Sequence, residues 1–166
     1  MEYVGQRSIK KLCNFYVSDL HLSVMLLPYL IKQIDEDVEI TTIFEDLKMQ
    51  DFIEIIEKIN IKDKNKILDI NWTIQDKNRN NVIEKTIING LNTKEKNTII
   101  IGGSKKFILE NNNKISEILN KKQIDNSIKI INCFNIEEVG IEMNNIVKQY
   151  DGVLNTSGEN INCVKK

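Results

Sequence analysis

The strongest constraint on the fold is an apolar pattern that changes its period several times along the chain. Runs rich in β-branched residues indicate strands at 14–17, 38–44, 66–72, 98–101 and 127–134, and Val153–Leu154 suggests one more. Stripes with a spacing of three and four residues indicate helices at 20–34, 52–59, 82–91, 115–119 and 139–150. Strands that alternate with helices, and that are apolar throughout, are typical of a parallel sheet covered on both faces. The sequence predicts a three-layer α/β/α fold with a mostly parallel sheet of five to six strands.

The chain has 166 residues, which suits a single domain. We expect a short N-terminal extension at 1–13, the domain at 14–159 and a C-terminal tail at 160–166. Pro28 lies inside the first helical stripe, where its missing N–H predicts a kink or a late helix start.

Charge and hydropathy exclude several classes of partner. The formal net charge is −1, so no strong field favours nucleic acid. The longest apolar run, at 24–31, is far shorter than the roughly 20 residues that cross a bilayer. Three widely spaced cysteines without a C-x-x-C pair favour reduced thiols in a cytoplasmic protein over disulfides or a zinc site. We therefore expect a cytoplasmic location, no nucleic-acid or membrane partner, and no metal.

Ligands of open α/β sheets bind beyond the carboxyl ends of the strands, so the residues there are the candidate site. The first strand is followed by Ser18, Asp19 and His21. This turn has no G-x-x-x-x-G-K-[ST] loop, and no G-x-G-x-x-G follows, which excludes the usual nucleotide and dinucleotide sites. Ser18 or Asp19 also suits a helix cap, and His21 suits either a general base or a packing residue. No catalytic residue and no cofactor are predicted.

The later strand ends add further candidates. Gly102, Gly103 and Ser104 form either a simple turn or, with Lys105, a nest of amides for an anion. Trp72 and Phe134 lie at the ends of the third and fifth strands, where they suit either the wall of an apolar ligand pocket or the core. Cys133, beside Phe134, is a further candidate for the ligand site and suits either a buried thiol or, with a lowered pKa, a reactive one. A phospho-accepting receiver domain is a minor alternative, because the first turn lacks a second acid and the fifth strand lacks a following lysine.

The order and spacing of several segments resemble a known family. The segments are Phe15–Asp19 before a helix, Ile99–Gly103, Ile118–Asn120, Ile130–Asn135 and 147–158, so the likeness covers roughly residues 14–159. They resemble the MEDS domain, the methanogen/methylotroph DcmR-type sensory domain, with Gly103 where the family has an acid. The resemblance implies a RecA/KaiC-like core without a phosphate loop and a sensory role.

The resulting expectation is a non-enzymatic sensory or regulatory domain. It would bind a small molecule or a regulatory protein at the carboxyl edge of the sheet and signal through protein contacts. Two alternatives stay open. One is a degenerate nucleotide-binding enzyme that holds phosphate with Gly102, Gly103, Ser104 and Lys105. The other is an interaction protein, such as a homodimer, whose surface is the helix face formed by Phe52, Ile55, Ile56 and Ile59.

Overall fold

The computed structural model describes residues 8–45, 47–75, 80–122, 126–155 and 158–161, and these residues contain one seven-stranded sheet. The strand order is β3-β2-β4-β5-β1-β6-β7. Six strands are parallel, and β7 is antiparallel to β6 at one edge. The predicted mostly parallel α/β fold is confirmed. The strands are β1 (Ser8–Tyr16), β2 (Glu39–Glu45), β3 (Asn71–Gln75), β4 (Lys96–Gly103), β5 (Ser127–Asn135), β6 (Gly152–Asn155) and β7 (Gly158–Ile161).

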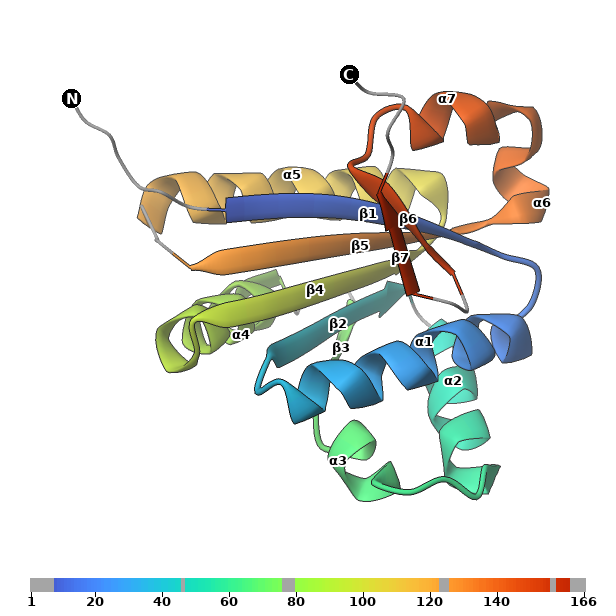
Figure 1. The fold of residues 1–166 in the computed structure, drawn as a ribbon. Coiled ribbons are helices and arrows are strands. Elements are labelled where there is room, and N and C mark those ends of the chain that lie inside the picture. Colours follow the sequence, from blue (N-terminus) through green and yellow to red (C-terminus); the bar gives the residue numbers. More distant parts are fainter. Residues whose placement is uncertain (1–7, 46, 76–79, 123–125, 156–157, 162–166) are drawn as a thin grey trace.

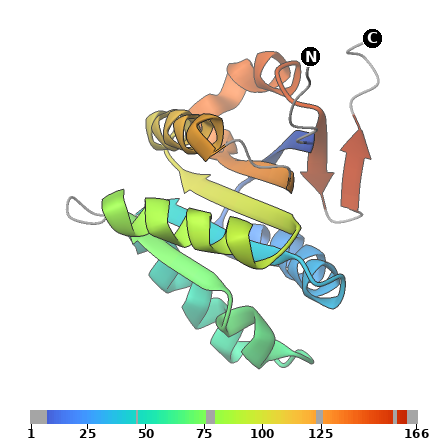
Figure 2. The same ribbon diagram turned by 90° about the vertical axis from the view of Figure 1, so that its left-hand side faces the viewer.

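Helices cover both faces of the sheet, as Figures 1 and 2 show. One face carries α1 (Asp19–Asp35), α2 (Leu47–Lys58) and α3 (Lys64–Leu68). The other carries α4 (Asn80–Thr93), α5 (Lys105–Lys122), α6 (Ile136–Val139), the 3-10 turn η1 (Gly140–Glu142) and α7 (Met143–Val147). Successive strand residues alternate between two apolar cores: Leu12 belongs to the α1 side and Cys13 to the α5 side. The three-layer architecture is therefore confirmed.

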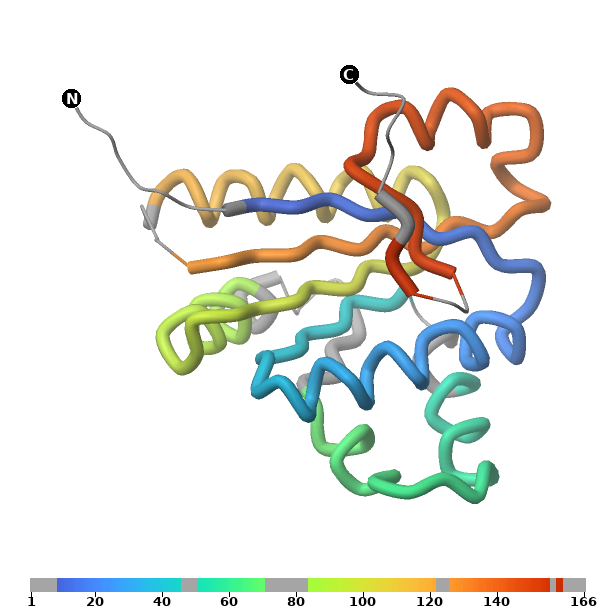
Figure 3. Tube along the Cα trace, viewed as in Figure 1, coloured from blue at the N-terminus to red at the C-terminus, as the bar shows by residue number. Residues whose placement is uncertain are grey.

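Helix α1 starts directly after Ser18 and runs as one helix through Pro28, as the trace in Figure 3 shows. It therefore has no late start. Pro28 is exposed, and so is Val24, whose carbonyl loses its usual N–H partner. Water can hydrate that carbonyl on the open side of the helix, which lowers the cost of the proline. The helix passes from the carboxyl end of β1 back to the amino end of β2, and it lies over the sheet along the way.

Two predicted elements need correction. Residues 66–68 of the predicted third strand are helical, and β3 begins only at Asn71. Ile67 is fully buried on the side of α1 and α2 while Lys66 is exposed, as expected for a segment that itself forms a turn of helix. A short apolar run does not distinguish the two periods. The predicted helix at 139–150 is broken into α6, η1 and α7 around Gly140, whose φ is +40°.

The ends of the domain also differ from the expected ones. Strand β1 begins at Ser8, so residues 8–13 are part of the sheet, and the rest of the predicted extension lies outside the described residues. At the other end, β7 reaches Ile161, and residues 162–166 of the predicted tail lie outside the description. The helix predicted around 115–119 is the longer α5.

The helix face proposed as a partner surface contributes two of its four residues to the buried core. Phe52 and Ile56 are buried on the α1 side of the sheet, and the Phe52 ring meets Phe44 edge to face at 5.6 Å between centroids. Ile55 and Ile59 are partly buried. Phe52 and Ile56 are therefore not available to a partner, whereas the homodimer or partner contact itself stays a prediction.

Candidate functional site

The turn after β1 uses its polar groups internally. Ser18 is the N-cap of α1, and its Oγ accepts a hydrogen bond from the His21 amide at 3.1 Å. His21 Nδ1 accepts a hydrogen bond from the Val17 amide at 3.0 Å. Asp19 is in the first helical turn, where a carboxylate suits the positive end of the helix dipole. The geometry of Ser18 and His21 is that of a helix cap and a turn.

The glycine turn after β4 is also satisfied from within the chain. The Ser104 amide donates to Glu45 Oε1 at 2.8 Å, and the Lys105 amide donates to Glu138 Oε1 at 3.0 Å. Ser104 Oγ caps α5 by accepting from the Phe107 amide at 3.1 Å. Two carboxylates of the protein thus hold the amides that an anion nest would offer a ligand.

Gly103 fits this turn for two physical reasons. Its φ is +154°, and a Cβ there would lie 2.7 Å from the Cβ of Glu45. Any other residue would be strained and would push Glu45 away from the Ser104 amide. Gly102 is also buried in β4, with a would-be Cβ 3.0 Å from the Phe44 ring. Gly102 therefore allows close packing against Phe44, and Gly103 leaves room for Glu45 to bind the Ser104 amide.

The remaining predicted site residues are Cys133, the strand neighbour of Gly102, and Trp72. Cys133 is fully buried in β5, and burial raises the pKa of its thiol. It is therefore a core residue, not a reactive nucleophile. Trp72 lies in β3 opposite Thr42, and its side chain is outside the described part of the structure. The structure thus brings Ser18 and His21 together in one turn and Gly102, Gly103 and Ser104 in another.

A second polar cluster lies on the α1 side of the sheet, nearer its amino end. Lys10 of β1, Lys129 of β5 and Thr98 of β4 are direct neighbours in strand register. Their side chains share the face that carries Leu12, Ile100 and Ile131 further along the same strands. A row of three polar residues therefore crosses this face of the sheet.

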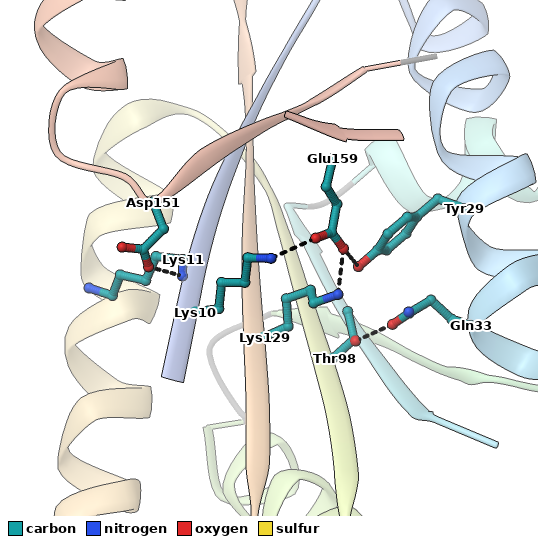
Figure 4. A network of polar contacts seen from close by, with 8 residues as sticks. All are labelled: Lys10, Lys11, Tyr29, Gln33, Thr98, Lys129, Asp151 and Glu159. Atoms are coloured by element: carbon teal, nitrogen blue, oxygen red, sulfur yellow. Dashed lines mark hydrogen bonds and ion pairs between the residues drawn. The ribbon is translucent and has the colours of Figure 1, made fainter. Parts of the chain in front are cut away.

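Groups from α1 and from β7 meet this row, as Figure 4 shows. The carboxylate of Glu159 accepts from Lys10 Nζ at 2.9 Å, from the Tyr29 hydroxyl at 3.0 Å and from Lys129 Nζ. The Lys129 ammonium also lies 5.5 Å from the centroid of the Tyr29 ring. Gln33 Oε1 accepts from the Thr98 hydroxyl at 2.5 Å. Five elements of the fold, namely α1, β1, β4, β5 and β7, thus contribute to one polar cluster.

The electrostatics of the cluster favour a charged Glu159. Burial alone would raise the pKa of its carboxyl, but the hydrogen bonds from Lys129 and Lys10 outweigh that effect and lower the pKa from 4.5 to about 2. Burial and the negative charge of Glu159 raise the pKa of Tyr29. Tyr29 is therefore a neutral hydroxyl donor at physiological pH, and Glu159 is a fixed carboxylate.

A cavity of about 540 Å³ opens beside this cluster, between α1 and the β6–β7 hairpin. Its volume is within the range of small-molecule sites. A second hollow of about 240 Å³ shares Gln33, Glu36 and Lys129 with the first. Among the side chains that the structure describes, none of those predicted for the carboxyl edge lines either one. The larger cavity is lined by Met25, Pro28, Tyr29, Lys32, Gln33, Glu36, Lys129, Asn155, Gly158 and Glu159.

The sequence holds one local signal for this cluster. Lys129 interrupts an apolar strand, and an ionisable group in a covered strand needs a partner. Sequence reasoning missed Lys10 because β1 starts earlier than predicted. Glu159 has no local signal at all, because its partners Tyr29 and Lys10 are 130 and 149 residues away along the chain.

Comparisons with known proteins leave the family open. No protein-family model matches the chain, and no curated protein matches it in sequence. Within the described residues, no helix is both long and apolar enough to cross a bilayer. The same part of the chain contains no group of three or more His, Cys, Asp or Glu side chains placed to hold a metal ion.

Proposed function

We propose that the protein is a regulatory domain of the sensory type that binds a small molecule in the cavity between α1 and the β6–β7 hairpin. The cavity itself carries this proposal. It combines an apolar wall from Met25 and Pro28 with the polar groups of Tyr29, Lys129 and Glu159. Apolar walls with a few converging polar groups are typical of small-molecule sites.

The proposal keeps the sensory role that the resemblance to the MEDS domain implies, together with its RecA/KaiC-like core, but it moves the ligand from the carboxyl edge to the α1 face. At the carboxyl edge, the amides of Ser104 and Lys105 already bind Glu45 and Glu138. On the α1 face, the β6–β7 hairpin at the edge of the sheet forms one wall of the cavity. A ligand that moves this hairpin would alter a sheet edge, which is a suitable surface for signalling to a protein partner.

Native mass spectrometry of the purified protein is the first test, because it reports a retained small molecule and the oligomeric state together. A candidate ligand is then titrated into two variants of α1. Pro28→Trp places a large ring at the rim of the cavity and should weaken binding at least tenfold. Val24→Trp changes an exposed residue of the same helix that does not line the cavity, and should bind as the wild type does.

The proposal fails if no small molecule is retained and none binds in a metabolite screen. It also fails if a ligand binds Pro28→Trp as tightly as it binds the wild-type protein. A ligand lost on Ser104→Ala but retained on Pro28→Trp would return the site to the carboxyl edge and favour the nucleotide-binding alternative.

A further inference from the structure

The polar cluster on the α1 face has more positive charge than Glu159 can neutralise. Two ammonium groups and one hydroxyl converge on its single carboxylate. Among the described residues, the larger cavity is lined by two lysines and two glutamates, and the smaller hollow by three lysines and one glutamate, so lysines outnumber glutamates over the two together. These charged residues are Lys10, Lys32, Lys96, Lys129, Glu36 and Glu159. An excess of positive charge in a partly desolvated hollow favours an anionic ligand.

Glu159 itself is carried by a strand that the sheet holds weakly. Strand β7 has four residues and pairs only with β6 among the described strands. Strand β6 in turn pairs with β1 at Leu12–Gly152 and Cys13–Val153, a far shorter ladder than that between β1 and β5. Short ladders at a sheet edge open locally at low free-energy cost.

The base of the hairpin has an anchor of its own. The Lys11 amide donates to Asp151 Oδ2 at 2.8 Å, and the Asp151 amide donates to the Lys11 carbonyl at 2.8 Å. Figure 4 shows this contact on the side of β1 away from Glu159. If the Glu159 contacts break, β7 loses its side-chain tie to α1, β1 and β5 and keeps its ladder with β6, while the start of β6 stays attached to β1.

We propose that Lys10, Lys129 and Tyr29 form a binding site for a small molecule bearing a carboxylate or phosphate group, and that Glu159 occupies this site in the absence of the ligand. The ligand's anionic group takes the place of the Glu159 carboxylate on the same three donors. Its remaining atoms fill the cavity beside Pro28. Displacing Glu159 removes the side-chain tie between β7 and the rest of the sheet and so loosens β7 on β6, and ligand binding is read out at the edge of the sheet. This inference rests on the proposed function, because it assigns a ligand class to the same cavity.

The test uses citrate as the carboxylate probe, pyrophosphate as the phosphate probe and sucrose as a neutral control, all at equal ionic strength in a calorimetric titration. Glu159→Gln removes the internal competitor's charge and should bind the preferred anion about tenfold more tightly. Lys129→Met should lose at least tenfold in affinity. Lys106→Met is the matched control: Lys106 is exposed at the start of α5 and lines neither cavity, so binding should not change.

Hydrogen exchange supplies an independent readout in the wild-type protein. Amides of β7 should exchange faster when the anion is bound, whereas those of the central strand β5 should not change. Preference for citrate or for pyrophosphate tells which anionic group the site takes. The inference is overturned if Glu159→Gln binds both anions no more tightly than the wild type, or if the anion protects β7. A neutral ligand that Pro28→Trp blocks and Lys129→Met leaves unaffected would overturn this inference and leave the proposed function standing.

Discussion

Replacing Glu159 by glutamine should destabilise the protein at neutral pH and have little effect in acid. Glutamine keeps the shape and one acceptor oxygen but loses the charge that faces Lys10 and Lys129. Lowering the pKa of Glu159 from 4.5 to about 2 corresponds to about 3 kcal/mol of stability. The Glu159 side chain is 20% exposed, and solvent screens such pairs. We therefore expect a loss of about 1–2 kcal/mol at pH 7.

The sign of the pH dependence follows from the direction of the pKa shift. The carboxyl binds its proton more tightly in the unfolded chain than in the folded one. Its contribution is therefore complete above the unfolded pKa of 4.5, and it is lost as the pH falls toward the folded pKa of about 2. The stability difference between wild type and Glu159→Gln should shrink across this window and disappear at its lower end.

Urea denaturation of the two proteins at several pH values between 7 and 2.5 measures this difference. Hydrogen exchange of the β6 amides is measured as well, because urea denaturation reports global unfolding and would not detect local opening of the hairpin. Glu110→Gln is the control, since Glu110 is exposed on α5. The reasoning is refuted if Glu159→Gln is as stable as the wild type at pH 7 by both measures. A difference that stays constant from pH 5 to pH 2.5 would refute it equally.

Three further predictions concern the residues of the carboxyl edge. Gly103→Ala should lower the free energy of unfolding in urea by about 2–3 kcal/mol, because its positive φ and the close contact with Glu45 both oppose a Cβ. Gly140→Ala is the control: a Cβ there has a positive φ but meets open space, so the loss should be only about 1 kcal/mol. Ser104→Ala should cost about 1 kcal/mol in the same assay through the lost α5 cap, and should leave citrate and pyrophosphate binding in the calorimeter unchanged. Cys133 should resist alkylation by iodoacetamide at pH 8 in the folded protein and react in urea, as peptide mass spectrometry would show; fast labelling of the native protein would contradict its burial.

Most of the fold was predictable because its signals are local. The strands around Ile99–Ile101 and Ile130–Ile131 are apolar on both faces, and the amphipathic stripe of α1 follows directly from residue spacing. Errors arose where the local signal was ambiguous. The segment around Ile67 is too short for its period to separate a turn of helix from a strand. Gly140 breaks the last helical stripe through a backbone conformation that spacing alone does not show.

The polar cluster was less predictable because strand register creates it. Lys10 and Lys129 are far apart in the sequence, and they become neighbours only when β1 pairs with β5 residue by residue. Glu159 then approaches them from a strand that follows β6 in an antiparallel turn. Each of these strand pairings depends on the whole sheet. The pattern of one segment can therefore mark a single residue as unusual, but it does not show that the residues form one site.

At both ends of the sheet, carboxylates of the chain itself accept hydrogen bonds from the donor groups. The two ends differ in the number of donors that each carboxylate serves. At the start of α5, Glu45 and Glu138 each hold one amide, so carboxylates and donors are matched one to one. On the α1 face, the single carboxylate of Glu159 serves Lys10, Lys129 and Tyr29. An incoming anion at the start of α5 would have to displace two glutamates, Glu45 and Glu138, from the amides that they bind. On the α1 face the anion would displace only Glu159, which belongs to an edge hairpin. It would then bind the ammonium groups of Lys10 and Lys129. Electrostatics and local stability therefore both favour ligand binding on the α1 face.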